Sequence, residues 1–254
     1  MIEAGVAAAR RGNGVVMEEL RWLAVVRHGQ STGNVIAQDA ETSGLEAIDI
    51  PERDADVPLS EAGRDQAAAV GSWLAEERPG FVVVSPYLRT RQTAEIALGD
   101  TGIPFVVDER LRDRELGVLD LLTGRGVQSR LPDEYARRAR LGKFYYRPPG
   151  GESWADVLLR LRALLRELRE DHPGGRIVLF GHEAIVLLVR YLAEQLSEEE
   201  LMKVAHETTI ANCSISTWER RDGRLQPVLF NDVAHIKDEG APHTKQEDVD
   251  ASPQ

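Results

Sequence analysis

The stretch Val25–Asn34, "VVRHGQSTGN", combines two kinds of sequence within ten residues. Its first two residues continue an apolar, β-branched run that starts at Trp22, and such a run predicts a buried strand. The run ends at Arg27 and His28, which are followed by glycines, hydroxyl groups and amides. Ligands of open α/β sheets bind beyond the carboxyl ends of the strands. The stretch therefore predicts a strand that carries a cation and an imidazole into a binding site.

The composition of the 254-residue chain limits the classes of protein to consider. A net charge of −11 disfavours a nucleic-acid partner, because the phosphate backbone would be repelled. Cys213 is the single cysteine, so neither an intrachain disulfide nor a thiolate zinc site is expected. No apolar run reaches the roughly 18 residues of a membrane span, and residues 1–20 lack the apolar core of a signal peptide. We therefore expect a cytoplasmic protein without a membrane partner.

Strands and helices are predicted to alternate through most of the chain. The expected strands are 22–26, 81–85, 105–108 and 176–180, and the expected helices are 60–74, 89–98, 153–171 and 181–196. A hairpin is expected from 212 to 230, with its turn around Arg221–Gly223. This alternation predicts an α/β fold with a mainly parallel central sheet and helices on both faces.

The remaining segments are polar or low in apolar residues. They are predicted as a flexible arm at 1–20, a long loop at 35–57, an irregular segment at 118–150 with a short helix near 133–141, and a disordered acidic tail at 237–254. Residues 21–236 are predicted to form a single domain.

Chemically reactive residues follow each of the expected parallel strands. The loops are "RHGQSTGN", "SPYLRTRQT", "GHE" and "DERLRDRELG". Because parallel strands end at one edge of a sheet, Arg89, His182 and a carboxyl group of Asp113 or Glu115 should converge on His28. A neutral imidazole attacks phosphorus, a guanidinium group binds phosphate oxygens, and a carboxylic acid protonates a departing oxygen. Each residue alone is more often structural, but together they predict phosphoryl transfer.

Six motifs recur in one order along the chain. They are "RHGQSTGN", "DVPLSEAGRDQA", "SPYLRTRQTA", "RLRDRELG", "PPGGES" and "GHEAI". In this order the chain resembles the histidine phosphatase superfamily, also called the phosphoglycerate mutase-like family, from about Val25 to Ile185 and on to "NCSIS". The resemblance implies a three-layer α/β sandwich whose small cap insertion, at about 118–150, sets substrate choice.

The resemblance also implies roles for the residues at the strand ends. His28 would be the nucleophile that becomes phosphohistidine. The residues implied to bind the phosphoryl group or the substrate are Arg27, Arg89, His182, Ser31 and Asn34, with Gln30 as a further candidate from the same loop. The family's proton donor stands four positions before a glycine, and counting back from Gly117 gives Asp113 rather than Glu115. The family usually has glutamate there, so the shorter aspartate is a departure.

Three residues near the expected site have open interpretations. Glu183 stands where mutases commonly have glycine, and it either caps the following helix or faces a cationic or hydroxyl group of the substrate. Tyr146 and Arg147, in "KFYYRPPGGES", are candidates to contact the leaving group. The alternative for the tyrosine is packing within the cap.

The motifs favour hydrolysis over mutase chemistry. Residues 35–57 lack the "TGW"-like stretch of mutases, and Arg147 has no adjacent second arginine. We therefore expect a histidine acid-type phosphatase that hydrolyses a small phosphomonoester through phosphohistidine, with no metal or other cofactor. The alternatives are a cofactor-dependent phosphoglycerate mutase, a phosphoprotein phosphatase, or a regulatory binding protein of the same fold. A kinase is disfavoured because "GxxxxGK[ST]" does not occur. The resemblance also makes a homodimer an expectation.

Overall fold

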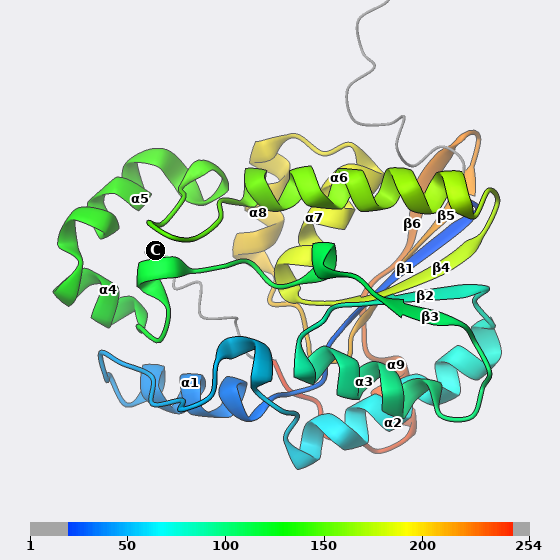
Figure 1. Cartoon of the computed structure of the whole chain (residues 1–254), viewed down its shortest axis with the longest axis horizontal. Coiled ribbons are helices and arrows are strands. Elements are labelled where there is room, and N and C mark those ends of the chain that lie inside the picture. The colour runs from blue at the N-terminus through cyan, green and yellow to red at the C-terminus, as the bar shows by residue number, and fades with distance from the viewer. Residues whose placement is uncertain (1–19, 246–254) are drawn as a thin grey trace, which may run out of the picture.

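The computed structural model describes residues 20–245, whose strands form one six-stranded sheet in the order β3–β2–β4–β1–β5–β6 (Figure 1). The first four strands pair in parallel with one another, whereas β5 and β6 pair antiparallel at one edge. The strands are β1 (Trp22–Arg27), β2 (Phe81–Val84), β3 (Phe105–Val107), β4 (Arg176–Gly181), β5 (Ile215–Arg221) and β6 (Arg224–Asp232). The mainly parallel sheet and the hairpin predicted from the sequence are confirmed.

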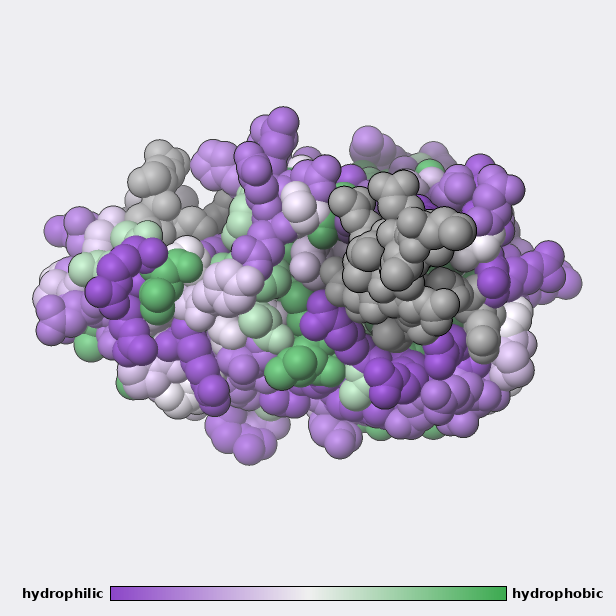
Figure 2. Space-filling model, turned by 90° about the horizontal axis from the view of Figure 1, so that it is seen from above, coloured by the Kyte–Doolittle hydropathy of each residue, from purple (hydrophilic) through white to green (hydrophobic). Residues whose placement is uncertain are grey.

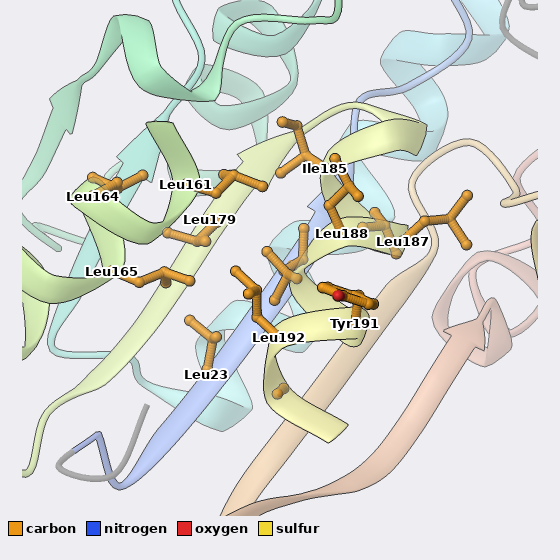
Figure 3. Packing of buried hydrophobic residues seen from close by; sticks show 14 of the residues in the cluster. Leu23, Leu161, Leu164, Leu165, Leu179, Ile185, Leu187, Leu188, Tyr191 and Leu192 are labelled. Carbon is orange, nitrogen blue, oxygen red and sulfur yellow. The ribbon is translucent and has the colours of Figure 1, made fainter. Parts of the chain in front are cut away.

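Helices cover both faces of the sheet. Successive strand residues point to opposite faces, so Leu23 joins one buried cluster and Ala24 the other. The first cluster is covered by α6 (Trp154–Asp171), α7 (Glu183–Glu194) and α8 (Glu198–Glu207), and the second by α2 (Glu61–Glu77), α3 (Leu88–Leu98) and α9 (Ala234–Asp238). Figure 3 shows Leu161 of α6 and Leu188 of α7 packed over the strands. The three-layer α/β sandwich is therefore confirmed, although the sequence did not predict α8.

The segment 35–57, predicted as a long loop, begins within a helix. This helix, α1 (Thr32–Thr42), is capped by Ser31, whose side chain accepts from the Asn34 N–H while the Asn34 side chain accepts from the Ser31 N–H. Only three small residues of α1 are buried. The loop prediction is wrong for residues 35–42, because this helix is set by its capping box rather than by an apolar stripe.

Residues 118–150, which we refer to as the cap, are more helical than predicted. The first cap helix, α4 (Gly124–Arg130), begins at Thr123, whose hydroxyl accepts a backbone N–H of the first turn. The second, α5 (Pro132–Tyr145), starts with a proline and is interrupted by Gly142 at φ 76° and ψ 155°. Both lie beside the sheet rather than over it (Figure 1). Three short 3₁₀ turns complete the described helices: η2 (Asp54–Asp56), η3 (Glu109–Leu111) and η4 (Gly117–Leu119).

The chain beyond α9 is ordered as far as residue 245, contrary to the predicted disordered tail of 237–254. Gln66 of α2 holds this segment, because its Nε2 donates to Pro242 O and to Thr244 Oγ1, both at 2.8 Å. Hydrogen bonds to a distant helix leave no trace in local composition, which is why the prediction is wrong for residues 237–245. Residues 246–254 lie outside the described residues.

Leu20 was predicted to belong to a flexible arm, yet it is fully buried in the first cluster. The other residues of that arm lie outside the described residues. On the face shown in Figure 2, the described residues are mostly hydrophilic, and the hydrophobic ones form small groups. None of the helices between residues 20 and 245 combines the length and apolarity that a membrane crossing requires.

Candidate active site

His28 directly follows β1 and is fully buried. Its N–H donates to Gly181 O of β4 at 2.9 Å, which extends the parallel pairing by one residue. Its ring Nδ1 lies 2.7 Å from Gly29 O. Because a carbonyl oxygen only accepts, Nδ1 carries the proton, and in the neutral ring the lone pair is on Nε2. The strand thus carries an imidazole whose lone pair is on Nε2, and its role as the nucleophile stays a prediction.

Three of the residues predicted to converge on His28 lie together beside it. His182 is fully buried, and its ring centroid is 5.2 Å from that of His28. Asp113 Oδ2 lies 3.2 Å from His182 Nδ1 and 3.2 Å from Arg89 Nη2. The Ser85 hydroxyl lies 2.8 Å from the other ring nitrogen of His182, Nε2. The ends of β1, β2 and β4 and the loop after β3 therefore meet at one place.

Arg27 and Glu183 are joined at the loop that precedes β5. Arg27 is fully buried, its Nη1 donates to Ile210 O, and its Nη2 lies 3.9 Å from Glu183 Oε2. Glu183 Oε1 accepts from the Ile210 N–H at 3.3 Å. The side chain of His182, the N-cap residue of α7, makes no capping hydrogen bond, and Glu183 is the acidic residue of the first turn. Both interpretations of Glu183 therefore stay predictions.

The loop after His28 divides its polar side chains between two directions. Ser31 and Asn34 line the cavity described next. Gln30 does not, because its Oε1 accepts from the Ser60 hydroxyl at 2.7 Å. Its backbone N–H donates to Gln66 Oε1 at 2.9 Å. Gln30 therefore fastens the loop to α2 instead of facing a ligand.

A cavity of about 520 Å³ lies between α1, the cap and α8, and Arg89, Asp113, Glu115 and Glu183 all line it. Part of its wall is apolar, formed by Ile48, Ile50, Val57, Leu116, Leu121, Leu187 and Met202. Its volume exceeds the needs of a phosphoryl group alone, so it has room for a substantial leaving group. Within residues 20–245, no group of three or more His, Cys, Asp or Glu side chains is arranged to hold a metal ion.

Tyr146 and Arg147, the predicted leaving-group contacts, are not among the residues that line the cavity. Tyr146 is fully buried in the cap, and its hydroxyl donates to Glu134 Oε2 at 2.8 Å. Burial and this hydrogen bond raise the pKa of Tyr146, so it remains a donor. Arg147 Nε donates to Gly151 O at 3.0 Å. The structure places Tyr146 in cap packing, the alternative that the sequence left open for it, whereas the Arg147 side chain is exposed.

The two candidate acids have different surroundings. Glu115 lines the cavity, but its Oε1 accepts from the Tyr87 hydroxyl at 3.1 Å. Burial and the charge of Asp113 raise the pKa of Tyr87, which keeps it a donor to Glu115. Asp113 instead contacts His182 and Arg89. Asp113 is therefore the carboxyl group next to His182 and Arg89, and its role as proton donor stays a prediction.

Several charged residues of the cavity were missed by sequence analysis. Asp54 of η2 accepts from Arg89 Nη1 through its Oδ1 at 2.8 Å and its carbonyl oxygen at 2.6 Å. Nothing distinguishes Asp54 in its acid-rich loop. The cations missed are Arg114, Arg138 and Lys143, which line the cavity. Of these cations, only Arg114 could have been found from the sequence, since it stands between the two candidate acids in "LRDRELG".

The family model of the histidine phosphatase superfamily (branch 1) matches residues 23–233. The match spans most of the chain and includes each strand end described above. The chain belongs to this superfamily, as its ordered motifs predicted.

Curated relatives include both phosphatases and mutases. A glucosyl-3-phosphoglycerate phosphatase of Mycobacterium tuberculosis is 30% identical over 216 residues, which cover 82% of this chain and 87% of that protein. A probable phosphoglycerate mutase of Yersinia enterocolitica is 31% identical over 224 residues, covering 84% of this chain and 93% of that protein. A solved structure of a mycobacterial glucosyl-3-phosphoglycerate phosphatase with VO3 is 27% identical, with a TM-score of 0.67 over 84% of this chain and all of that one. The phosphohistidine mechanism is general to this superfamily.

Proposed function

We propose that this chain hydrolyses phosphomonoesters through a phosphohistidine at His28 Nε2. The observation that carries the proposal is the hydrogen bond from His28 Nδ1 to Gly29 O, which leaves Nε2 as the nucleophile. Arg89 and Asp113 stand beside the neighbouring His182 as cation and acid. The site therefore holds a nucleophile, a phosphate-binding guanidinium group and a proton donor.

The first step transfers the phosphoryl group to the enzyme. His28 Nε2 forms a bond to phosphorus as the bond from phosphorus to the leaving oxygen breaks. Asp113, protonated at this stage, gives its proton to the departing oxygen. Arg27 and Arg89 stabilise the charge on the equatorial phosphoryl oxygens. The leaving group departs as a neutral alcohol.

The second step releases inorganic phosphate. The Asp113 carboxylate takes a proton from a water molecule, whose oxygen attacks the phosphorus. The bond between phosphorus and Nε2 breaks, and its electron pair returns to the ring. Asp113 is then protonated and His28 neutral, which restores the starting state. We also propose the histidine acid type of phosphatase for this chain.

We propose a small phosphorylated metabolite as the substrate. The cap lines the cavity through Arg138 and Lys143, and a covered cavity suits a small molecule better than a phosphoprotein. Its volume of about 520 Å³ and its partly apolar wall suit a leaving group that presents both a hydrophobic face and polar groups. The Mycobacterium tuberculosis relative makes glucosyl-3-phosphoglycerate one compound to test.

Phosphoglycerate mutase activity is the second candidate. Arg114, Arg138 and Lys143 bring three cations to the cavity wall, which suits a substrate that carries a second anionic group. The Yersinia enterocolitica relative is named a probable phosphoglycerate mutase. A mutase would keep the phosphoryl group on His28 until the intermediate accepts it, whereas a phosphatase admits water.

We further propose that the chain works as a cytoplasmic homodimer whose only other partner is its substrate, with neither nucleic acid nor membrane bound. The net charge of −11 supports the absence of a nucleic-acid partner. Sedimentation equilibrium over a range of protein concentrations tests the dimer. A monomer at micromolar concentration would contradict it.

The experiment is a hydrolysis screen over phosphomonoesters of sugars, glycerates and nucleotides. Mutase activity is measured alongside with 2,3-bisphosphoglycerate as phosphoryl donor. We expect phosphate release from at least one small ester, and its loss in His28→Ala. Release that persists in His28→Ala would contradict the nucleophile. Isomerisation faster than release would favour the mutase.

A further inference from the structure

The loop that carries His28 is tied to the chain beyond α9 by a ring of side-chain hydrogen bonds. The ring passes through Gln66 of α2, Thr244 and Asn212. It starts at the Gln30 N–H and ends at His28 O. Thr244 lies beyond residue 233, where the match to the superfamily ends. The ring therefore joins a segment beyond the matched region to the active-site loop.

Only one arrangement of donors satisfies the first half of this ring. The Gln30 N–H donates to Gln66 Oε1 at 2.9 Å, so the other amide atom of Gln66, Nε2, is a donor. Nε2 donates to Thr244 Oγ1 at 2.8 Å. The hydroxyl oxygen accepts this bond, and its own proton is left for Asn212 Oδ1 at 2.9 Å. The Thr244 hydroxyl thus accepts a hydrogen bond from Gln66 and donates one to Asn212.

The hydrogen bonds keep the same donor-to-acceptor direction from Asn212 to the active-site loop. With its Oδ1 occupied by Thr244, Asn212 presents Nδ2 to His28 O at 3.4 Å and to Asn34 Oδ1 at 3.5 Å. Asn34 Oδ1 also accepts from the Ser31 N–H at 3.0 Å. Two donors on this oxygen leave Asn34 Nδ2 as the group that donates into the cavity that Asn34 lines.

We propose that Thr244 is a positioning residue that sets the orientation of the Asn34 amide through Asn212. Through Asn212, its hydroxyl reinforces the orientation in which Asn34 Oδ1 accepts from the Ser31 N–H and Asn34 Nδ2 is the donor presented to the phosphoryl group. The inference rests on the proposed function, because it concerns the binding of that group. Asn212 N–H also donates to Thr244 O at 3.2 Å. Loss of the hydroxyl alone would keep this backbone contact, so the segment should stay in place.

The test compares Thr244→Val, which loses the hydroxyl, with Thr244→Ser, which keeps it. Binding of inorganic phosphate is measured by calorimetry, and kcat and KM are measured on the best ester. We expect Thr244→Val to weaken phosphate binding and raise KM about fivefold, and Thr244→Ser to stay within about twofold of the parent. Ser72→Ala is the matched control, because it removes a 2.7 Å bond to Glu239 outside the ring. We expect this control to bind phosphate normally.

A second comparison shows whether Thr244 acts through Asn34. In the Asn34→Ala background, we expect Thr244→Val to change phosphate binding by less than about twofold. A full effect of Thr244→Val in that background would overturn the inference. Phosphate binding by Thr244→Val equal to that of the parent would overturn it as well. Failure of the proposed function is distinguishable, because the parent would then bind phosphate but hydrolyse no ester.

Discussion

At the residue scale, His28 and Asp113 each face a partner that suits a different step of phosphoryl transfer. The Gly29 carbonyl accepts from His28 Nδ1, which places the lone pair of the neutral ring on Nε2, the atom that we propose attacks. Asp113 contacts both His182 and Arg89, the residues that we propose bind the phosphoryl oxygens. Two substitutions test this division of roles.

The proton donor is tested by Asp113→Asn and Glu115→Gln. An amide gives no proton to a departing alkoxide, so we expect Asp113→Asn to lower kcat on alkyl phosphates by about 10²-fold or more. The loss should be smaller on p-nitrophenyl phosphate, whose leaving group needs little protonation. Glu115→Gln should change kcat by only about twofold to threefold, since it alters one hydrogen bond with Tyr87. The opposite pattern would make Glu115 the donor.

Asp54 pairs with Arg89, the residue that we propose binds phosphate. Its carboxylate lies 2.8 Å from Arg89 Nη1, and this side chain is half exposed. We expect Asp54→Asn to tighten binding of inorganic phosphate about fivefold, because a negative charge is removed from the guanidinium group. Asp56→Asn is the matched control, since that carboxylate pairs with Arg53 at the surface. Equal effects of both substitutions on phosphate affinity would contradict a specific role of Asp54.

At the scale of elements, the strand ends were predictable and several helices were not. The strands carry β-branched apolar runs, so the points at which "VVRHG" and "VLFGHE" change character mark the strand ends. The start of α1 depends on a capping box, and α8 also went unpredicted. The position of Thr244 depends on Gln66 and Asn212, which are distant in sequence. Local patterns do not contain the contacts of Thr244, and the same limitation concealed Asp54 and the packing of Tyr146. The capping boxes that start α1 and α8 are local patterns, which the strand and helix periodicity does not register.

The close approach of α2 to the His28 loop requires glycine. A Cβ on Gly63 would lie 2.0 Å from Gln30 O. We therefore expect Gly63→Ala to push the loop away, to lower the free energy of unfolding by about 1–3 kcal/mol and to reduce kcat/KM about tenfold or more. Gly80→Ala is the control, because its Cβ would meet its nearest neighbour, Arg176 O, at 3.8 Å. Urea unfolding and steady-state kinetics measure both effects, and a Gly63→Ala protein as active as the control would refute the packing argument.

At the scale of the whole molecule, the chain is acidic, but cations gather at the candidate active site. The net charge is −11, yet Arg27 and Arg89 are gathered at the strand ends and further cations line the cavity from the cap. Acids share the same cavity, and Asp120 is one of them. Burial and the charge of Asp54 raise the pKa of Asp120. Holding this carboxylate ionised therefore costs stability.

The cost at Asp120 predicts a pH dependence of stability. A raised pKa in the folded state favours the protonated form, so the cost grows as pH rises from the ordinary aspartate range through the raised pKa. We expect Asp120→Asn to raise the melting temperature by about 1–2 °C at neutral pH and to have no effect at a pH below both pKa values. Thermal melts of both proteins from pH 3 to pH 8 measure the difference. A gain that is equal at every pH would show that ionisation of Asp120 is not its source.

The most direct measurement of transfer through His28 is rapid-quench labelling with a ³²P-labelled phosphomonoester that the chain hydrolyses. We expect a label that is stable in alkali and labile in acid, as phosphohistidine is, and that peptide mass spectrometry places on His28. It should form at least as fast as phosphate is released, and it should be absent from His28→Ala. A label on another residue, or hydrolysis by His28→Ala at the parent rate, would contradict nucleophilic catalysis by His28.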